Sequence, residues 1–308
     1  MRTGVTAILP SGRRGLRPVF AGFSTLNGYG EISGTSWLKE SGVLEGPVLL
    51  TNTYSVGIVR DAAVEWCLDH GGSPSFGDLP VVAETYDGRL NDIQGHHVTR
   101  TDTFRALDGA RSGPVAEGNV GGGTGDICFG FKGGIGTSSR QVRIREEFTV
   151  GVLVQANHGR RYQLVLSGVP VGRELIPDRA ATAESGSIVV VVATDAPLLP
   201  HQLDRLARRC GLGLARSGSV SGDGSGDFFL AFSTANTPPV QGEATKAVAM
   251  LANKALDPLF EAVIEATDEA IGNALAAARS IVGFGGFRAE ALPWPKVMEI
   301  LARFGRGR

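Results

Sequence analysis

The sequence predicts an α+β fold in which helices cover the faces of β-sheets. Short runs of β-branched and aromatic residues, bounded by Gly, Pro and Asn, dominate the first two-thirds of the chain. Apolar residues at helical spacing occur mainly in one early segment and after residue 200. The 44 glycines among 308 residues indicate many tight turns. Sheets with helices packed on them are the natural layering for this order of elements.

The composition indicates an ordinary globular protein, and we expect residues 1–308 to form one domain. The chain is 42% hydrophobic and 20% charged, and its net charge of −1 predicts neither a nucleic-acid nor a membrane partner. Cys67, Cys128 and Cys210 are far apart without CxxC spacing, which indicates buried thiols in a reducing compartment. The histidines show no HExxH pattern, so we expect no metal and no cofactor. Residues 5–9 are too short for a signal sequence, which favours a cytoplasmic location.

The first half of the chain predicts strands and two helices. Apolar residues recur at helical spacing from residue 55 to residue 70, where Gly71 and Gly72 end the helix. A polar segment at 101–109 indicates a second, shorter helix. Strands are predicted at 5–9, 19–23, 46–51, 80–84, 127–131, 141–154 and 162–166. The polar linker at 171–185 is the expected exposed, cleavable loop.

The second half of the chain predicts a buried strand, then mostly helices. Residues 188–195 open with five consecutive β-branched residues, which is typical of a strand buried on both faces. An amphipathic helix follows at 200–212, and a second strand at 228–232 comes after a Gly/Ser loop. The pattern at 242–282 predicts a helical segment divided at Pro258, with Asp257 as N-cap, and 296–304 predicts a last helix.

Ser187 stands where a small polar loop enters the buried strand. If the Gly186–Ser187 bond were cut, the Ser187 hydroxyl and its new α-amine would lie side by side on a rigid element. An α-amine with a pKa of roughly 8 can take the hydroxyl proton near neutral pH, which makes a nucleophile without histidine. Glycine before the cut permits the strained turn that an N→O acyl shift needs. The alternative is that Gly-Ser simply forms a turn before a strand.

Three further groups of residues could serve such a nucleophile. Asn157, at the end of a long strand, can donate to a developing oxyanion, although it could also be an ordinary turn residue. Glu84 and Tyr86, two residues apart, could bind the amine and carbonyl of a substrate or form a solvated turn. Ser225 and Asp227 have the same spacing, so the carboxylate could orient the hydroxyl near the nucleophile, or both could belong to the glycine-rich loop.

The glycine-rich segment at 118–126 could cradle a phosphate with its backbone N–H groups. No GK[ST] follows it, and a predicted strand comes next instead of a helix, so neither the P-loop nor the Rossmann context is present. A close approach of two backbone segments near a site is the favoured interpretation.

Taken together, these motifs resemble the DmpA-type aminopeptidases, which comprise L-aminopeptidase/D-esterases and β-aminopeptidases. The similar segments extend over nearly the whole chain and are residues 2–10, 44–48, 51–53, 56–62, 84–88, 118–125, 193–198 and 230–236. The resemblance implies a four-layer α/β/β/α sandwich and a self-processing serine hydrolase of the N-terminal-nucleophile kind. It implies an α chain of residues 1–186 and a β chain of residues 187–308, which assemble as a homo-oligomer.

The resemblance also implies roles for individual residues. Ser187 would be the nucleophile and Asn157 an oxyanion donor. Tyr86 would assist in the site, Glu84 would receive the free amine of the substrate, and the pair Ser225 and Asp227 would position the nucleophile. Some relatives carry Glu at the position of Asp227, and relatives usually have several dozen residues before the segment that matches residues 2–10.

The predicted activity is release of N-terminal residues from short peptides, amides or esters through an acyl-Ser187 intermediate. One alternative is an acyltransferase of the ornithine-acetyltransferase kind, which uses a threonine nucleophile where this chain has Ser187. A second alternative is a binding or structural member of the fold that is never cut.

Overall fold

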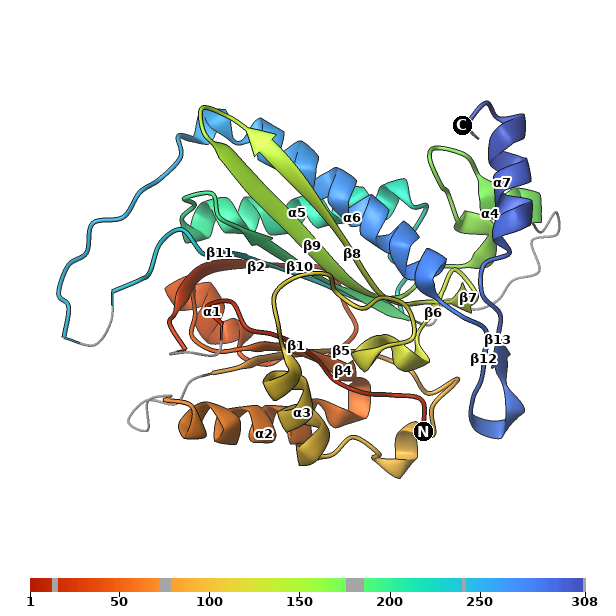
Figure 1. Cartoon of the computed structure of the whole chain (residues 1–308), viewed down its shortest axis with the longest axis horizontal. Helices are drawn as coiled ribbons and strands as arrows, with labels where there is room; N and C mark the ends of the chain where they lie inside the picture. Colours follow the sequence, from red (N-terminus) through yellow and green to blue (C-terminus); the bar gives the residue numbers. More distant parts are fainter. Residues whose placement is uncertain (13–15, 72–78, 176–185, 240–241, 307–308) are drawn as a thin grey trace.

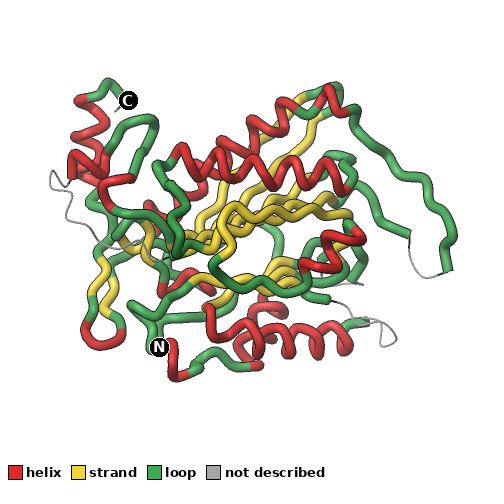
Figure 2. The backbone as a smooth tube through the Cα atoms, turned by 180° about the vertical axis from the view of Figure 1, so that it is seen from behind, coloured by secondary structure: helices red, strands yellow, loops and turns green. Residues whose placement is uncertain are grey.

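The computed structural model describes residues 1–12, 16–71, 79–175, 186–239 and 242–306, and these form four layers. Figure 1 shows two helices over a large sheet, a smaller sheet beneath it, and two more helices on the outer face of the small sheet; Figure 2 shows the same stacking from behind. The predicted α/β/β/α sandwich is therefore confirmed.

The large sheet has six strands and contains the Ser187 strand near its centre. Its order is β3 (Val43–Leu44), β2 (Val19–Gly28), β11 (Gly226–Ser233), β10 (Ser187–Thr194), β9 (Glu147–Asn157) and β8 (Gly134–Arg143). β10 runs parallel to β11 and antiparallel to β9. Ile188, Val190 and Val192 pack toward the outer helices, whereas Val189 and Val191 pack toward the small sheet. This two-sided burial explains why the strand is apolar at every position.

The small sheet has three strands in the order β1 (Thr6–Ile8), β4 (Val48–Asn52) and β5 (Val81–Thr85). β4 and β5 are parallel, and β1 is antiparallel to β4. Leu50 faces the large sheet, while its neighbour Leu49 packs under the outer helices. The strands β4 and β5 therefore end at the same edge of the sheet, which places the residues after Asn52 and Thr85 side by side.

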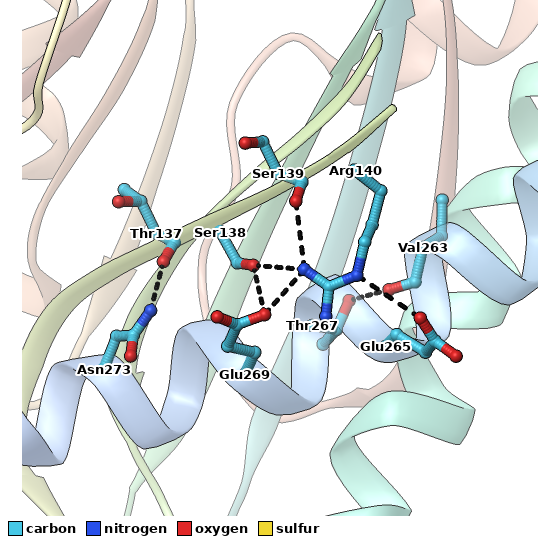
Figure 3. Close-up of polar contacts among 9 residues, drawn as sticks. All are labelled: Thr137, Ser138, Ser139, Arg140, Val263, Glu265, Thr267, Glu269 and Asn273. Carbon is cyan, nitrogen blue, oxygen red and sulfur yellow. Dashed lines mark hydrogen bonds and ion pairs between the residues drawn. The ribbon is translucent and has the colours of Figure 1, made fainter. Parts of the chain in front are cut away.

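Long helices cover the two outer faces. The small sheet is covered by α2 (Val56–Asp69) and α3 (Arg100–Gly109), and the large sheet by α5 (Pro200–Arg216) and α6 (Asp257–Ala277). Figure 3 shows how α6 is attached to the edge strand β8: the Arg140 guanidinium contacts Glu265 at 3.3 Å and Glu269 at 2.6 Å, and Asn273 donates to the Thr137 carbonyl. The remaining helices and strands are α1 (Thr35–Ser41), β6 (Ile127–Cys128), β7 (Phe131–Lys132), α4 (Val171–Leu175), β12 (Ile281–Val282), β13 (Arg288–Ala289) and α7 (Trp294–Arg303). No helix among the described residues is long and apolar enough to cross a bilayer.

Three predictions for the middle of the chain are wrong because turns divide the predicted strands. The predicted strand at 127–131 is instead part of a hairpin of β6 and β7 over residues 127–132, since Phe129 and Gly130 both take positive φ. Residues 141–154 belong to two strands, joined by a tight turn in which Ile144 N–H donates to Glu146 O. Residues 162–166 are not a strand, and a 3₁₀ turn covers Arg161–Gln163.

The helical prediction for 242–256 is also wrong. Residues 242–250 are exposed and have no helical structure, so no apolar face packs on the body of the protein. Helices in proteins depend mainly on such packing, and alanine-rich sequence alone does not supply it. The helix begins at Asp257, which is its first residue, and Leu256 occupies the N-cap position that we predicted for Asp257.

Candidate active site

Ser187 is the first residue of β10 and lies between two neighbouring strands. Its partner in the antiparallel β9 ladder is Asn157, and the parallel neighbour β11 begins beside it at Gly226. The Gly226 N–H donates to Ser187 Oγ at 3.1 Å. The side chain is 4% exposed, so the hydroxyl is held in one place at the edge of the core.

Gly186 packs directly on the backbone of β9. A Cβ at this position would collide with the Asn157 carbonyl oxygen, so only glycine fits without a shift. Of the predicted linker at 171–185, residues 171–175 form α4, and the others lie outside the described residues. The backbone at the predicted cut site is therefore fixed by contact with the strand that carries Asn157.

The Asn157 side chain is held by hydrogen bonds on both of its polar atoms. Asn157 is the last residue of β9 and is buried. Its Oδ1 accepts from Ile127 N–H at 2.7 Å, and its Nδ2 donates to the Tyr86 carbonyl at 2.9 Å. These two bonds set the orientation of the amide.

Ser225 and Asp227 flank Gly226, whose N–H contacts the Ser187 hydroxyl. Ser225 Oγ donates to Asp227 Oδ1 at 2.7 Å, and both residues are buried. Asn27 on β2 holds the preceding loop, because its Nδ2 donates to the carbonyls of Gly222, Asp223 and Ser225. A register shift between β2 and β11 at Asp227/Phe228 re-aims the start of β11, as bulges near active sites commonly do.

Glu84 and Tyr86 reach the same site from the small sheet. A cavity of about 440 Å³ opens beside Ser187, and its lining is Tyr29, Gly30, Thr53, Tyr54, Glu84, Tyr86, Gly186, Ser187 and Gly224. Tyr86 is 42% exposed and its ring lies over Gly88, where a Cβ would strike it. The structure thus brings all seven predicted residues to one end of the sandwich, around or directly behind this cavity.

The Glu84 carboxylate is buried without a positively charged partner among the described residues. It is 1% exposed, and it accepts hydrogen bonds from Glu31 N–H at 2.9 Å and from the Thr53 hydroxyl, both neutral donors. Burial raises the pKa of Glu84, and the two hydrogen bonds lower it in part. A cation that enters the cavity would therefore restore the charge balance of this group.

Several lining residues were not predicted as site residues from the sequence. Thr53 holds the Glu84 carboxylate, Tyr29 and Tyr54 form walls, and Gly30 leaves the space that Glu84 Oε1 occupies. Thr53 lies in one of the segments that resemble the DmpA-type enzymes, and that was the available signal. The contact between residues 30 and 84 follows from tertiary packing and has no local signature.

The glycine-rich segment at 118–126 packs closely against neighbouring backbone, as the favoured interpretation predicts. Gly121–Gly125 forms a 3₁₀ turn, and a Cβ at Gly123 would collide with the backbone of Gly134 and Ile135. The Gly122 N–H is taken by Thr6 Oγ1 at 3.1 Å, so it does not point into an open phosphate cradle.

A larger hollow of about 900 Å³ lies between the sheets near β1 and the segment 109–116. Arg111 is the one charged residue in its described lining, which contains no Asp, Glu, His or Cys. It therefore lacks a general base, and the smaller cavity at Ser187 remains the candidate active site. No group of three or more His, Cys, Asp or Glu side chains in the described part of the chain could hold a metal ion.

A sandwich of two sheets between two layers of helices is the architecture of the N-terminal-nucleophile class of hydrolases, and Ser187 starts a central strand of it. Comparison with solved structures gives the same class. The β-aminopeptidase of a Burkholderia species is 47% identical, with a TM-score of 0.91 over 99% of this chain and 87% of that one. The L-aminopeptidase D-Ala-esterase/amidase of Ochrobactrum anthropi, described as a variant of the Ntn-hydrolase fold, is 40% identical, with a TM-score of 0.90 over 100% and 93%.

Sequence comparison also identifies the family of the chain. The family model for peptidase family S58 matches residues 1–289. The beta-peptidyl aminopeptidase BapA of Sphingosinicella microcystinivorans is 49% identical over 99% of this chain and 81% of that protein. The chain belongs to peptidase family S58. It is a serine aminopeptidase, and the predictions of an enzyme and of this family are confirmed.

Proposed function

We propose that this aminopeptidase cuts its own Gly186–Ser187 bond and then uses Ser187 as the nucleophile. In the first step Ser187 Oγ attacks the Gly186 carbonyl carbon and the Gly186–Ser187 C–N bond breaks, which leaves an ester and a free α-amine on Ser187. Water then hydrolyses the ester and frees the Gly186 carboxylate. The position of Ser187 supports this: it is the first residue of a buried central strand, and its Oγ already accepts from Gly226 N–H.

The acylation step then needs no histidine. Ser187 Oγ attacks the carbonyl of the substrate, and the neutral α-amine of Ser187 takes the hydroxyl proton. One hydrogen of Asn157 Nδ2 is bound to the Tyr86 carbonyl, and that carbonyl is its one acceptor among the described residues. The second hydrogen can therefore donate to the oxyanion. Water then releases the acyl group from Ser187.

Recognition of the substrate rests on Glu84. Its buried carboxylate lines the cavity that Ser187 also lines, so an N-terminal ammonium can pair with Glu84 while the adjacent carbonyl lies at Ser187. This shared cavity is the observation that carries the proposal. The substrates are then short peptides, amides or esters with a free amine, and the name of the S. microcystinivorans relative supports N-terminal β-residues among them.

The intact mass of the denatured protein tests the first step. We expect two polypeptides, one ending at Gly186 and one starting at Ser187. The Ser187→Ala variant should stay uncut and inactive, whereas Ser233→Ala, at the far end of the neighbouring strand β11, should be cut and active. An uncut wild-type chain would instead favour the non-maturing alternative.

The substrate class is tested with two matched chromogenic amides, one carrying alanine and one carrying β³-homoalanine. Hydrolysis of the β-residue amide at a kcat/KM no lower than that of the α-residue amide supports the proposal. Hydrolysis of the α-residue amide alone would restrict the activity to ordinary peptides. Light scattering of the cut protein tests the expected assembly into a homo-oligomer.

A further inference from the structure

Lys132 is a completely buried lysine that the proposed mechanism does not use. Its exposure is 0%, and lysine is almost never buried to this extent without partners. Its Nζ donates to three backbone carbonyls: Gly123 at 3.0 Å, Asp126 at 2.9 Å and Gly133 at 2.8 Å. These three acceptors match the three hydrogens of an ammonium ion.

The Asp126 side chain belongs to the same buried cluster; burial raises its pKa to about 8, and Lys132 lowers it in part. Burial lowers the pKa of Lys132, and the Asp126 carboxylate beside it raises that pKa in part. The Asp126 carboxylate is itself buried and accepts from the Thr85 hydroxyl at 2.9 Å. Thr85 is the last residue of β5 and directly precedes Tyr86. The cluster therefore lies immediately behind the cavity lined by Glu84 and Tyr86.

One peptide group connects Lys132 to Asn157. The Asp126 carbonyl accepts from Lys132 Nζ, and the N–H at the other end of that peptide, Ile127 N–H, donates to Asn157 Oδ1 at 2.7 Å. The Asn157 amide is thus the second amide in a chain of hydrogen bonds that starts at a positive charge. Hydrogen bonds in such chains polarise one another, and the effect is strongest where water is excluded.

We propose that Lys132 is a positioning residue for the hydrolytic reaction, which orients and polarises the Asn157 amide through the Asp126–Ile127 peptide. Electron density shifts toward Oδ1 when a polarised N–H donates to it, and the Nδ2 hydrogens become better donors to the oxyanion. The inference rests on the proposed function, because it needs Asn157 to contact the oxygen of the substrate.

A purely structural role predicts a different outcome. Lys132 also ties the β6–β7 hairpin to the glycine-rich turn, so its loss could simply loosen this region. Loosening lowers stability and affects kcat and KM together. Loss of polarisation acts on the transition state, where the oxyanion forms, and therefore lowers kcat while KM changes little.

The test is a double-mutant cycle between residue 132 and Asn157. Lys132→Gln keeps hydrogen-bond donors but removes the charge, and Lys132→Met removes both. Each is combined with Asn157→Ala, and rates are normalised to the amount of cut chain measured by intact mass. Gln202→Met is the matched control, because Gln202 is a buried side chain of α5 whose amide donates to the Leu251 carbonyl far from the site.

We expect Lys132→Gln to lower kcat about tenfold with KM changed by less than about twofold, and Lys132→Met to do the same. In the Asn157→Ala background, either change should lower kcat by less than about a further twofold, since the amide that Lys132 polarises is already gone. Gln202→Met should lower the melting temperature and leave kcat unchanged.

The results separate this inference from the proposed function. If Asn157→Ala leaves kcat unchanged, the proposed oxyanion role is wrong. If Asn157→Ala lowers kcat but the Lys132 variants do not, the role of Asn157 holds and the proposed role of Lys132 is wrong. The same conclusion follows if the effects of the Lys132 and Asn157 changes on kcat multiply in the double variants. If neither Lys132 variant folds, Lys132 serves only the stability of the fold and the inference is overturned.

Discussion

The two sides of the Ser187 cavity are built in different ways. The side that carries the proposed nucleophile, the nucleophile side, belongs to three neighbouring strands of the large sheet, in which Ser187 is paired with Asn157 and Ile188 with Asp227. The side proposed to recognise the substrate, the recognition side, is formed by Glu84 near the end of β5, by Thr53 and Tyr86 just after β4 and β5, and by the turn after β2.

Under the proposed function, this difference separates the residues that react from those that bind the substrate. A residue in a strand ladder is held by backbone hydrogen bonds on both sides, which suits atoms that must react in one geometry. Thr53 and Tyr86 lie just beyond their strands, where a side chain can change without breaking a ladder, which suits specificity. Glu84 is the exception, because it is paired with Thr51 in the β4–β5 ladder. Changes on the nucleophile side should therefore affect self-cleavage and kcat, and changes on the recognition side should affect KM.

The largest effect is expected on the nucleophile side, at Gly186. A Cβ in Gly186→Ala would collide with the Asn157 carbonyl and displace the start of β10. We expect self-cleavage to slow at least about a hundredfold, because an ångström of misplacement can cost that much. The measurement is the rate at which the new β chain appears in intact-mass spectra.

Gly272→Ala serves as the control for this prediction. Gly272 lies in α6, where an added Cβ would meet nothing within 4 Å, so this variant should be cut at the wild-type rate. Wild-type self-cleavage in Gly186→Ala would show that the tight contact does not matter, and the nucleophile side would be less rigid than we infer.

On the recognition side, Glu84→Gln should raise KM by about a hundredfold for substrates with a free amine and change kcat little. A hydrogen bond to a charged group contributes about 1.5–3 kcal/mol, and the Gln amide cannot pair with an ammonium ion in this way. Steady-state kinetics measure the effect. An ester without an amine is the control substrate, and its KM should not differ between wild type and variant.

The pH dependence of KM for the wild-type enzyme should reflect the protonation of Glu84. Burial favours the neutral form, so the pKa of Glu84 lies above its ordinary value. As the pH falls through this raised pKa, Glu84 takes up a proton, the ammonium loses its partner and KM rises. Glu84→Gln should lack this acidic rise in KM. If the rise persists in Glu84→Gln, another group binds the amine.

A smaller effect is expected at Ser225, which stands behind the nucleophile. Ser225→Ala removes the hydroxyl that donates to Asp227 at 2.7 Å, beside the Gly226 N–H that contacts Ser187. We expect kcat to fall about tenfold with KM unchanged, which corresponds to one buried hydrogen bond to a carboxylate. Ser233→Ala on the same strand is the matched control. A change in KM alone would contradict this prediction and indicate that Ser225 acts in substrate binding.

The smallest effect is expected for Tyr86→Phe. The ring stays over Gly88, and only a hydroxyl on a 42% exposed side chain is lost. A single hydrogen bond of this kind corresponds to about a two- to tenfold change in kcat/KM. Competition kinetics with both enzymes in one assay can resolve so small a difference. A loss above about a hundredfold would instead make the phenol a direct participant in the chemistry.

Patterns local to the chain were enough to predict much of the fold. The strand that starts at Ser187, the helix α2 and the helix α5 each carry a clear periodicity or an unbroken apolar run. The wrong predictions concern segments in which the local sequence pattern does not indicate the structure. The alternation at 141–154 does not reveal a turn, and the alanine-rich pattern does not reveal that residues 242–250 are exposed and have no helical structure.

The sequence by itself determined that Ser187 starts a buried strand, since a small Gly-Ser junction before an apolar run is a local property. It also predicted Ser187 as the nucleophile and the residues at strand ends that could assist it. Only the tertiary structure decided how they act. The burial of Glu84 beside Thr53, and the path from Lys132 to Asn157, depend on contacts between segments distant in sequence. Burial sets the strength of a charge and the direction of a pKa shift, and no stretch of sequence encodes burial alone.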